Sequence, residues 1–230
     1  MKIVERIYNL GRLAAPADFV ARLVKQGECQ TALDIGCGQS SALSGFRPGL
    51  QTFGLDASES ALEVSRRARV HDHYILGDIL KTAPETILQA NGGRRFDIVA
   101  MFDVIEHVPK RLGLELLEAC EQLTSKFVIV VTPNGFLEQG PEFGNEYQRH
   151  LSGWFPHDFE GLGYRVHGTS GLKALHGYAG LYRWNIPGIK FLDVGMAHLL
   201  NATNRYRFAF SLVAVKDIRG VPARLGSTVS

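Results

Sequence analysis

The chain has 230 residues, of which 45% are hydrophobic and 21% are charged, and its formal net charge is +2. This length and composition suit one domain with one substantial core and argue against extensive disorder. The charged residues are spread along the sequence, so electrostatics give no reason to invoke nucleic acid or another polyanion as a partner.

The three cysteines, Cys29, Cys37 and Cys120, are odd in number and form no CxxC pair. This usage disfavours both a disulfide framework and a structural zinc site, and it suits a reducing cytosol. The sequence contains no stretch of roughly 18 consecutive apolar residues, as a membrane span requires, and no signal-peptide pattern. We therefore expect a cytoplasmic protein without an integral membrane segment, while peripheral membrane contact stays open.

Short apolar runs alternate with helix-like stretches along the chain. Helical patterns separate the first five runs, notably Ser58–Arg69, with Ser58 as a cap, and Pro109–Leu123, with Pro109 in the first turn. This alternation predicts an α/β, Rossmann-like sheet that is mostly parallel, has helices on both faces and forms its ligand crevice at the carboxyl ends of the strands. The seven predicted strands are Thr31–Ile35, Gln51–Leu55, His73–Leu76, Phe96–Phe102, Lys126–Thr132, Tyr164–Gly168 and Phe208–Lys216.

Three segments fall outside this alternation within the single domain 1–230. Residues 1–28 are expected to be helical. Residues 135–155 carry aromatic side chains among glycines and charges, which suits either a cover over an apolar acceptor or ordinary packing. Residues 172–207 show no clean period and are expected to form an irregular insert that packs over the sheet edge, binds an acceptor or forms a dimer surface.

The segment "TALDIGCGQSSAL" places Gly36 and Gly38 between the first strand and a helix expected to start near Gln39. Glycines there let the backbone turn sharply and approach a ligand, and the helix start offers amide donors. The next strand ends at Asp56, whose carboxylate can accept hydrogen bonds from both hydroxyls of a ribose. A bound nucleoside is the expected ligand, and a tight turn without a ligand is the plain alternative.

Two kinds of nucleoside ligand fit this loop. A dinucleotide site normally carries GxGxxG, but Ser41 replaces the third glycine, and the acidic Asp34 stands where pyrophosphate would lie. A carboxylate there suits a ligand with a cationic amino-acid tail, such as S-adenosylmethionine.

The motifs "LDIGCG", "GLDAS", "LGDIL" and "FDIVAMFDVIEHV" occur in this order. Together they resemble class I S-adenosylmethionine-dependent methyltransferases, within them the type 11/12-like small-molecule group that includes the ubiquinone and menaquinone methyltransferases. The resemblance implies a final strand antiparallel to its neighbours and S-adenosyl-L-methionine as the cofactor. It also implies the following site: Asp34, Gly36 and Gly38 at the methionine tail, Asp56 at the ribose, Ala57 beside the adenine, Asp78 at the adenine amine, Ile79 on the ring and Phe102 near the methyl group.

A sulfonium methyl group is already activated, so the protein mainly has to position the acceptor, but a hydroxyl acceptor must also lose its proton. His107 and His150 are the candidate bases, with His107 favoured because it lies near the end of the fourth strand. The alternatives are a capping or core role for His107 and a lid or backbone-bonding role for His150. Asp103 and Glu106 could suggest a metal pair, but their spacing favours a capped helix start, so no metal is expected.

We therefore expect a methyltransferase that acts on a small-molecule acceptor, with an oxygen atom of a sugar, secondary metabolite or phenolic compound as the expected target. Two other functions stay open, an NAD-dependent oxidoreductase and a catalytically silent S-adenosylmethionine-binding regulatory module. A homodimer is an open option, and nucleic acid is not an expected partner because no dense basic stripe or appended binding domain is evident.

Overall fold

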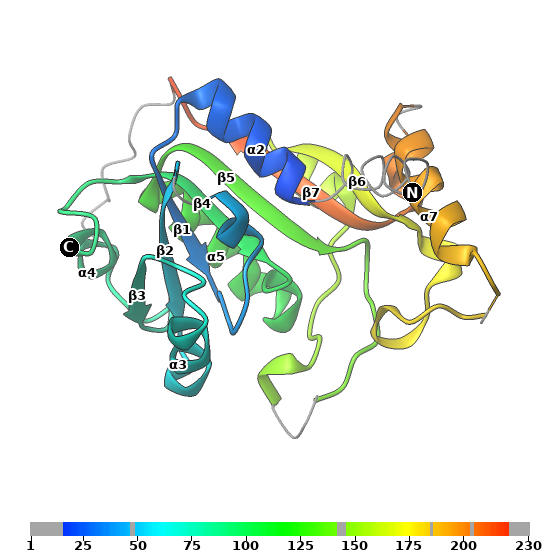
Figure 1. Cartoon of the computed structure of the whole chain (residues 1–230), viewed down its shortest axis with the longest axis horizontal. Helices are drawn as coiled ribbons and strands as arrows, with labels where there is room; N and C mark the ends of the chain where they lie inside the picture. Colours follow the sequence, from blue (N-terminus) through cyan, green and yellow to red (C-terminus); the bar gives the residue numbers. More distant parts are fainter. Residues whose placement is uncertain (1–15, 47–48, 142–145, 185, 203–204, 221–230) are drawn as a thin grey trace.

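The computed structural model describes residues 16–46, 49–141, 146–184, 186–202 and 205–220. Seven strands and six α-helices follow one another along these residues (Figure 1). The strands are β1 (Thr31–Ile35), β2 (Gln51–Asp56), β3 (His73–Leu76), β4 (Phe96–Phe102), β5 (Thr124–Pro133), β6 (Arg165–Leu172) and β7 (Ala209–Asp217). The helices are α2 (Pro16–Gly27), α3 (Glu59–Arg67), α4 (Pro84–Gln89), α5 (Lys110–Leu123), α6 (Pro156–Glu160) and α7 (Ile189–Ala202), with short 3₁₀ turns at Ala42–Phe46, Ile105–His107, Glu146–Gln148, Lys173–Leu175, Tyr178–Gly180 and Tyr206–Phe208.

All seven strands form one sheet in the order β3-β2-β1-β4-β5-β7-β6. The pairs among β1 to β5 are parallel, and β7 runs antiparallel to both β5 and β6. The predicted fold class, a mostly parallel Rossmann-like sheet with an antiparallel last strand, is therefore confirmed. This strand order also differs from the dinucleotide-binding order 3-2-1-4-5-6, in which the sixth strand directly follows the fifth.

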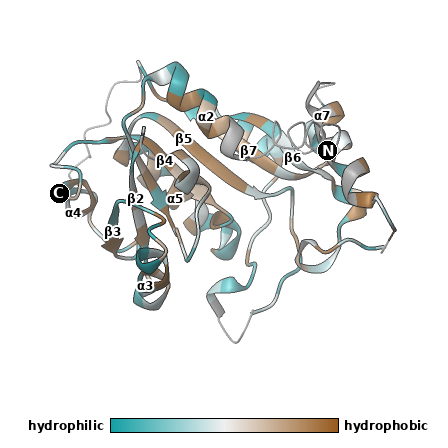
Figure 2. Ribbon diagram, in the orientation of Figure 1, coloured by the Kyte–Doolittle hydropathy of each residue, from teal (hydrophilic) through white to brown (hydrophobic). Residues whose placement is uncertain are grey.

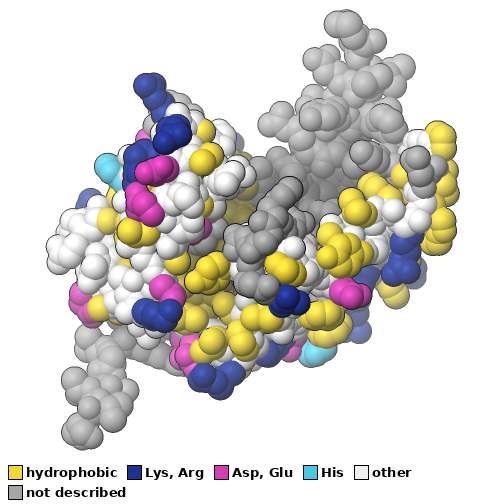
Figure 3. All heavy atoms as spheres, turned by 90° about the horizontal axis from the view of Figure 1, so that it is seen from below, with side chains coloured by type: hydrophobic (Ala, Val, Ile, Leu, Met, Phe, Trp, Pro, Cys, Tyr) yellow, Lys and Arg dark blue, Asp and Glu magenta, His cyan; other side chains and the backbone are white. Residues whose placement is uncertain are grey.

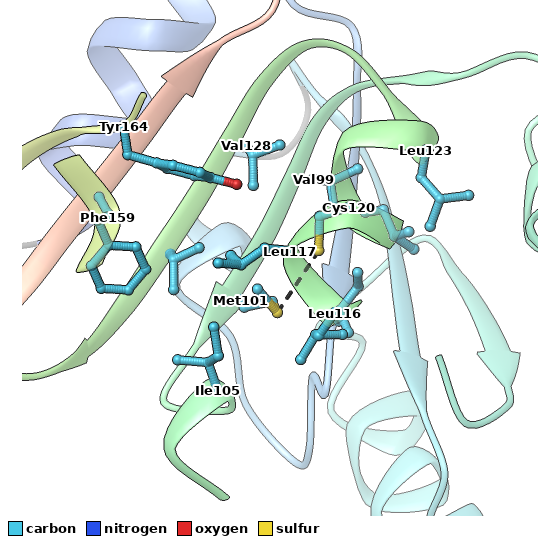
Figure 4. Packing of buried hydrophobic residues seen from close by; sticks show 14 of the residues in the cluster. Val99, Met101, Ile105, Leu116, Leu117, Cys120, Leu123, Val128, Phe159 and Tyr164 are labelled. Atoms are coloured by element: carbon cyan, nitrogen blue, oxygen red, sulfur yellow. Dashed lines mark hydrogen bonds between the residues drawn. The ribbon is translucent and has the colours of Figure 1, made fainter. Parts of the chain in front are cut away.

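Alternate residues of the central strands face two apolar layers. On β4, Val99 and Met101 pack in one buried cluster with α5, while Ile98 and Ala100 pack in the other with α2. Figure 4 shows the α5 side of this packing, and Figure 2 shows that the central strands are largely hydrophobic. Since successive side chains of a strand point to opposite faces, burial on both faces explains why these strands read as unbroken apolar runs.

Helix starts follow the sequence signals in part. Ser58 caps α3, its hydroxyl accepting a hydrogen bond from the Ala61 amide at 3.3 Å, as predicted. Pro109 is the residue just before α5 and does not lie in its first turn. The helix expected near Gln39 is wrong, because only a 3₁₀ turn over Ala42–Phe46 follows the first loop.

The insert 172–207 is less irregular than expected, because it contains the 14-residue helix α7. The buried Asp193 of α7 accepts hydrogen bonds from the Leu172 amide at 2.6 Å and the Tyr182 hydroxyl at 3.0 Å. The helix is thus tied to the end of β6. Of the helical segment expected over 1–28, the structure describes α2 (Pro16–Gly27), and residues 1–15 lie outside the described part. No helix among the described residues has both the length and the apolar character to span a bilayer.

Candidate functional site

The loop after β1 turns sharply at the carboxyl edge of the sheet. Gly36 and Gly38 have φ values of +67° and +53°, in the left-handed region that glycine adopts without strain. The amides of Gly36 and Cys37 both donate to the Leu55 carbonyl of β2, at 2.8 and 3.1 Å. A Cβ on Gly36 would lie 2.7 Å from Val104 Cγ2, whereas a Cβ on Gly38 would meet no described atom within 4 Å. The loop is therefore packed below Gly36 and open above Gly38.

Asp56 at the end of β2 connects this loop to the next one. Its Oδ2 accepts from the Gly38 amide and its Oδ1 from the Ser58 amide, each at 2.8 Å. A carboxylate has about four lone-pair sites, so each oxygen retains one for a further donor. The half-buried Asp56 is thus oriented by backbone amides and can still accept two hydroxyl groups.

Asp34, near the end of β1, is buried beneath the loop. Its side chain is only 1% exposed, accepts a hydrogen bond from the Ser41 hydroxyl and lies 3.5 Å from His71 Nε2. Burial raises the pKa of this carboxyl, while hydrogen bonds from His71 and Ser41 act in the opposite direction. A direct contact between Asp34 and a ligand stays a prediction. In this structure the carboxylate holds Ser41 and His71 beneath the loop.

The loop after β3 carries the next predicted residues. Asp78 accepts from the Leu80 amide at 3.0 Å and forms an ion pair with Lys81 at 2.7 Å, and hydrogen bonds from these two residues lower the pKa of Asp78. Ile79 is half-buried against the core, and Ala57, at the end of the neighbouring strand β2, is exposed. These side chains line the same edge as Asp56, because β2 and β3 run parallel.

The carboxyl end of β4 has a strained residue. Phe102, the last residue of β4, is half-buried, and Asp103 follows with φ of +53°, its amide donating to the Val131 carbonyl at 2.9 Å. Positive φ is uncommon outside glycine, Asn and Asp, and such positions cluster at functional sites. Asp103 is exposed as a residue, yet desolvation by the surrounding protein raises the pKa of its carboxyl.

Glu106, His107 and His150 meet beside this strand end. One ligand atom from each lies within 4.8 Å of the others, and the two imidazole rings are T-shaped with centroids 4.8 Å apart. Glu106 is 2% exposed, and burial raises its pKa, with the charge of Asp103 acting in the same direction. The capped helix start expected at Asp103 and Glu106 is wrong, because Glu106 lies inside a 3₁₀ turn and its carboxylate accepts from Thr132 within the core.

No sequence pattern predicts the contacts that place His150 beside Glu106 and His107. The amides of Leu151 and Ser152 donate to the Glu106 carbonyl at 2.8 and 3.0 Å, and the buried Trp154 indole donates to the Ile105 carbonyl at 3.3 Å. Residues 150–154 are therefore anchored to the 3₁₀ turn. Whether residues 135–155 form a lid stays a prediction, and part of this segment, 142–145, lies outside the described residues.

The face that carries this edge mixes side chains of every kind. Figure 3, seen from below the view of Figure 1, shows hydrophobic side chains next to interspersed acidic and basic groups among its coloured residues. The segment after β5 lies on this side of the sheet (Figure 1). An acceptor that approached here would meet a surface that is apolar in part.

Comparisons with known proteins agree with this geometry. Residues 33–137 match the family model described as a methyltransferase domain. A ubiquinone biosynthesis O-methyltransferase of Serratia proteamaculans (strain 568) is 35% identical over 95 residues, which are 41% of this chain and 38% of that protein. A mitochondrial enzyme of the same name from Candida albicans is 37% identical over 98 residues, 40% of this chain and 29% of that protein. The matched segments thus span less than half of these curated relatives.

Solved structures extend the likeness of the fold over nearly the whole chain. The plantazolicin methyltransferase BpumL, in complex with SAH, is 18% identical with a TM-score of 0.54, covering 93% of this chain and 88% of that one. Magnesium protoporphyrin IX methyltransferase (ChlM) from Synechocystis PCC 6803, with bound SAM, is 14% identical with a TM-score of 0.50, covering 94% and 84%. The sheet order and the match of residues 33–137 to a methyltransferase domain thus make the chain similar to class I S-adenosylmethionine-dependent methyltransferases, whose fold it shares.

Proposed function

We propose that the chain binds S-adenosylmethionine and transfers its methyl group to a small-molecule acceptor. One observation carries the proposal: the Asp56 carboxylate is held by the Gly38 and Ser58 amides beside the open space above Gly38. In this assignment Asp56 accepts from both ribose hydroxyls and Ala57 lies beside the adenine. Asp78 accepts from the adenine amine, Ile79 packs on the ring, and Gly36 and Gly38 form the floor of the methionine tail.

The methyl group would be delivered near Phe102 and Asp103, because the carboxyl end of β4 is adjacent to that of β1. The sulfonium is already activated, and holding the acceptor in line at near-attack distance contributes several kcal/mol of the roughly 8–23 kcal/mol by which enzymes lower barriers. His107 and His150 are the proposed catalytic pair for removal of an acceptor proton. His107 is the better placed of the two to reach an acceptor, because it is only half-buried while His150 is 7% exposed.

An oxygen acceptor is the proposed target. The curated relatives are named as O-methyltransferases, and the histidine cluster would serve an acceptor hydroxyl that must lose a proton. A phenolic compound, sugar or secondary metabolite each offers such a hydroxyl.

Calorimetry with S-adenosylhomocysteine and with NAD separates this proposal from the oxidoreductase alternative. We expect stoichiometric binding of S-adenosylhomocysteine and no measurable heat with NAD at the same concentrations. Ser41 takes the place of the third glycine of a pyrophosphate loop, and the strand order is not that of a dinucleotide fold. Tighter binding of NAD than of S-adenosylhomocysteine would overturn the assignment. Transfer of a radiolabelled methyl group to a panel of phenols and sugars would then distinguish an enzyme from a silent binding module.

Substitutions at Gly36 and Gly38 form a matched pair that tests whether the open space above Gly38 holds the ligand. Gly36→Ala should lower the free energy of unfolding by about 1–3 kcal/mol, because its Cβ meets Val104 at 2.7 Å and its φ is positive. Gly38→Ala should cost about 1 kcal/mol of strain but weaken S-adenosylhomocysteine binding at least tenfold, because its Cβ enters the proposed ligand space. Denaturant titration and calorimetry measure the two effects, and unchanged affinity in Gly38→Ala would place the ligand elsewhere.

A further inference from the structure

We propose that Glu106, His107 and His150 bind one divalent transition-metal ion of the Mn²⁺–Zn²⁺ series. The inference deepens the proposed function, on which it rests for its role in catalysis. Its first support is geometric: a carboxylate oxygen and two imidazole nitrogens lie within 4.8 Å of one another. Ligands at about 2.0–2.2 Å from a common ion in tetrahedral geometry lie about 3.3–3.6 Å apart, so the side chains would have to close by at most about 1.5 Å.

The second support is an unsatisfied buried oxygen. The Glu106 side chain is almost completely buried, and its Oε2 accepts from the Thr132 hydroxyl at 2.9 Å. Its Oε1 is fully covered yet has no hydrogen-bond partner in the described part of the chain. Leaving a buried polar group unpaired costs about 1–3 kcal/mol, more for a charged one, so a native structure normally satisfies it. A cation beside the two imidazoles would do so.

The third support is the orientation of the imidazoles. His107 Nδ1 lies 3.2 Å from the Arg149 carbonyl and His150 Nδ1 lies 2.8 Å from the Leu137 carbonyl. A carbonyl only accepts, so both Nδ1 atoms carry a proton, and in the neutral imidazole each Nε2 atom then carries the lone pair. Metal-ligating histidines are held in this manner, with the second ring nitrogen donating to a carbonyl or carboxylate. These contacts fix the tautomer that a metal ion requires.

The ligand types select the metal class. Imidazole nitrogen suits zinc, iron, copper and nickel, whereas Mg²⁺ and Ca²⁺ prefer oxygen ligands throughout. Three protein ligands leave at least one coordination position open, which is the pattern of catalytic sites and not of structural ones. The cluster follows β4, at whose carboxyl end the proposed methyl transfer takes place.

A metal ion there would change how the acceptor loses its proton. Coordination to the ion would lower the pKa of the acceptor hydroxyl, and its proton would pass to solvent. The oxygen lone pair would then form the new O–CH₃ bond while the CH₃–S⁺ bond breaks and its electron pair returns to sulfur, leaving neutral S-adenosylhomocysteine. The part that His107 and His150 play in removal of the acceptor proton, proposed above, would then be exerted through the metal ion that they bind.

Zn²⁺ titration of the metal-stripped full chain tests the proposal, with Mg²⁺ as the comparison ion. We expect one Zn²⁺ per chain by calorimetry and by elemental analysis after dialysis, and no stoichiometric Mg²⁺ binding. Glu106→Gln and His107→Gln should each weaken Zn²⁺ binding at least tenfold. His157→Gln removes a histidine whose side chain is 76% exposed and which lies outside the cluster, and it should leave the affinity unchanged.

Substitution with Co²⁺ gives a readout besides affinity. The bound ion should give visible bands of nitrogen and oxygen ligation without a thiolate charge-transfer band, which excludes binding at the buried cysteines. Absence of stoichiometric Zn²⁺ binding, or equal affinity in wild type and both cluster variants, would overturn the proposal. Thermal melting monitors the fold of each variant; should Glu106→Gln fail to fold, the half-buried His107→Gln decides the question.

The same variants separate this inference from the proposed function. Glu106→Gln and His107→Gln should bind S-adenosylhomocysteine within about threefold of wild type, because neither residue is among those assigned above to the adenosyl ligand. If Zn²⁺ fails to bind while S-adenosylhomocysteine binds normally, only the metal proposal falls. If neither ligand binds to the folded wild type, the proposed function itself falls.

Discussion

Replacing Asp56 with Ala should weaken S-adenosylhomocysteine binding by at least about 100-fold. Two ribose hydroxyls donating to an ionised carboxylate contribute about 1.5–3 kcal/mol each, and about 1.4 kcal/mol corresponds to a factor of ten in affinity. The side chain also accepts from the Gly38 and Ser58 amides, so its loss frees the loop that forms the floor of the site. Both effects act in the same direction.

The control for this variant is Glu63→Gln, which removes the same unit of charge from an exposed position on α3. It should change the S-adenosylhomocysteine dissociation constant by less than twofold, measured by calorimetry at the same ionic strength. Circular dichroism would confirm that Asp56→Ala remains folded. A dissociation constant within threefold of wild type in folded Asp56→Ala would contradict the assignment of the ribose site.

The positions of the strands were predictable because the sheet lies between two apolar layers. The central strands are buried on both faces, so runs such as Phe96–Phe102 are apolar throughout and end where polar or glycine residues begin. The loop residues that follow them were predictable for the same reason: in parallel strands every carboxyl end meets one edge. The sequence alone therefore predicts that Asp56, Asp78 and Asp103 lie at this edge.

The parts that local patterns do not reveal depend on contacts between distant segments. Asp34 lies 3.5 Å from His71, whose ring packs over Gly54 of β2, and no local pattern encodes that pair. The Glu106–His107–His150 cluster exists because the amides of Leu151 and Ser152 reach back to the Glu106 carbonyl. The spacing of Asp103 and Glu106 could not reveal a third ligand so far along the chain.

Helix α7 was missed for a related reason. Its apolar residues are not confined to one stripe, since Leu192 and Leu199 are exposed while Ile189 and Leu200 are buried. Local periodicity therefore gives a weak helical signal, and tertiary contacts supply what it lacks. Asp193, tied to the Leu172 amide and the Tyr182 hydroxyl, is the contact that holds the helix in place.

Replacing Trp154 with Ala should lower the free energy of unfolding by about 3–5 kcal/mol, the usual range for a buried tryptophan. Its ring is 0% exposed, stacks on Phe159 with centroids 5.2 Å apart and lies under Lys110 Nζ at 3.7 Å. The indole packs on Gly113 of α5, where a Cβ would be 2.4 Å from its Cζ2, so the side of the cavity formed by Gly113 has no side chain to fill it. For a chain of this size the loss corresponds to a fall in Tm of about 6–20 °C.

The other tryptophan supplies the control, because Trp184 is 53% exposed and Trp184→Ala should change stability by no more than about 0.5 kcal/mol. Trp154→Phe separates packing from polarity: it keeps the contact with Phe159 but removes the indole donor to the Ile105 carbonyl and the Ser152 hydroxyl. Since that donor anchors the turn before Glu106, Trp154→Phe should weaken Zn²⁺ binding more than S-adenosylhomocysteine binding. A loss below 1 kcal/mol in urea unfolding of Trp154→Ala would mean that residues 150–154 are not packed in the core, and the anchoring of His150 would lose its basis.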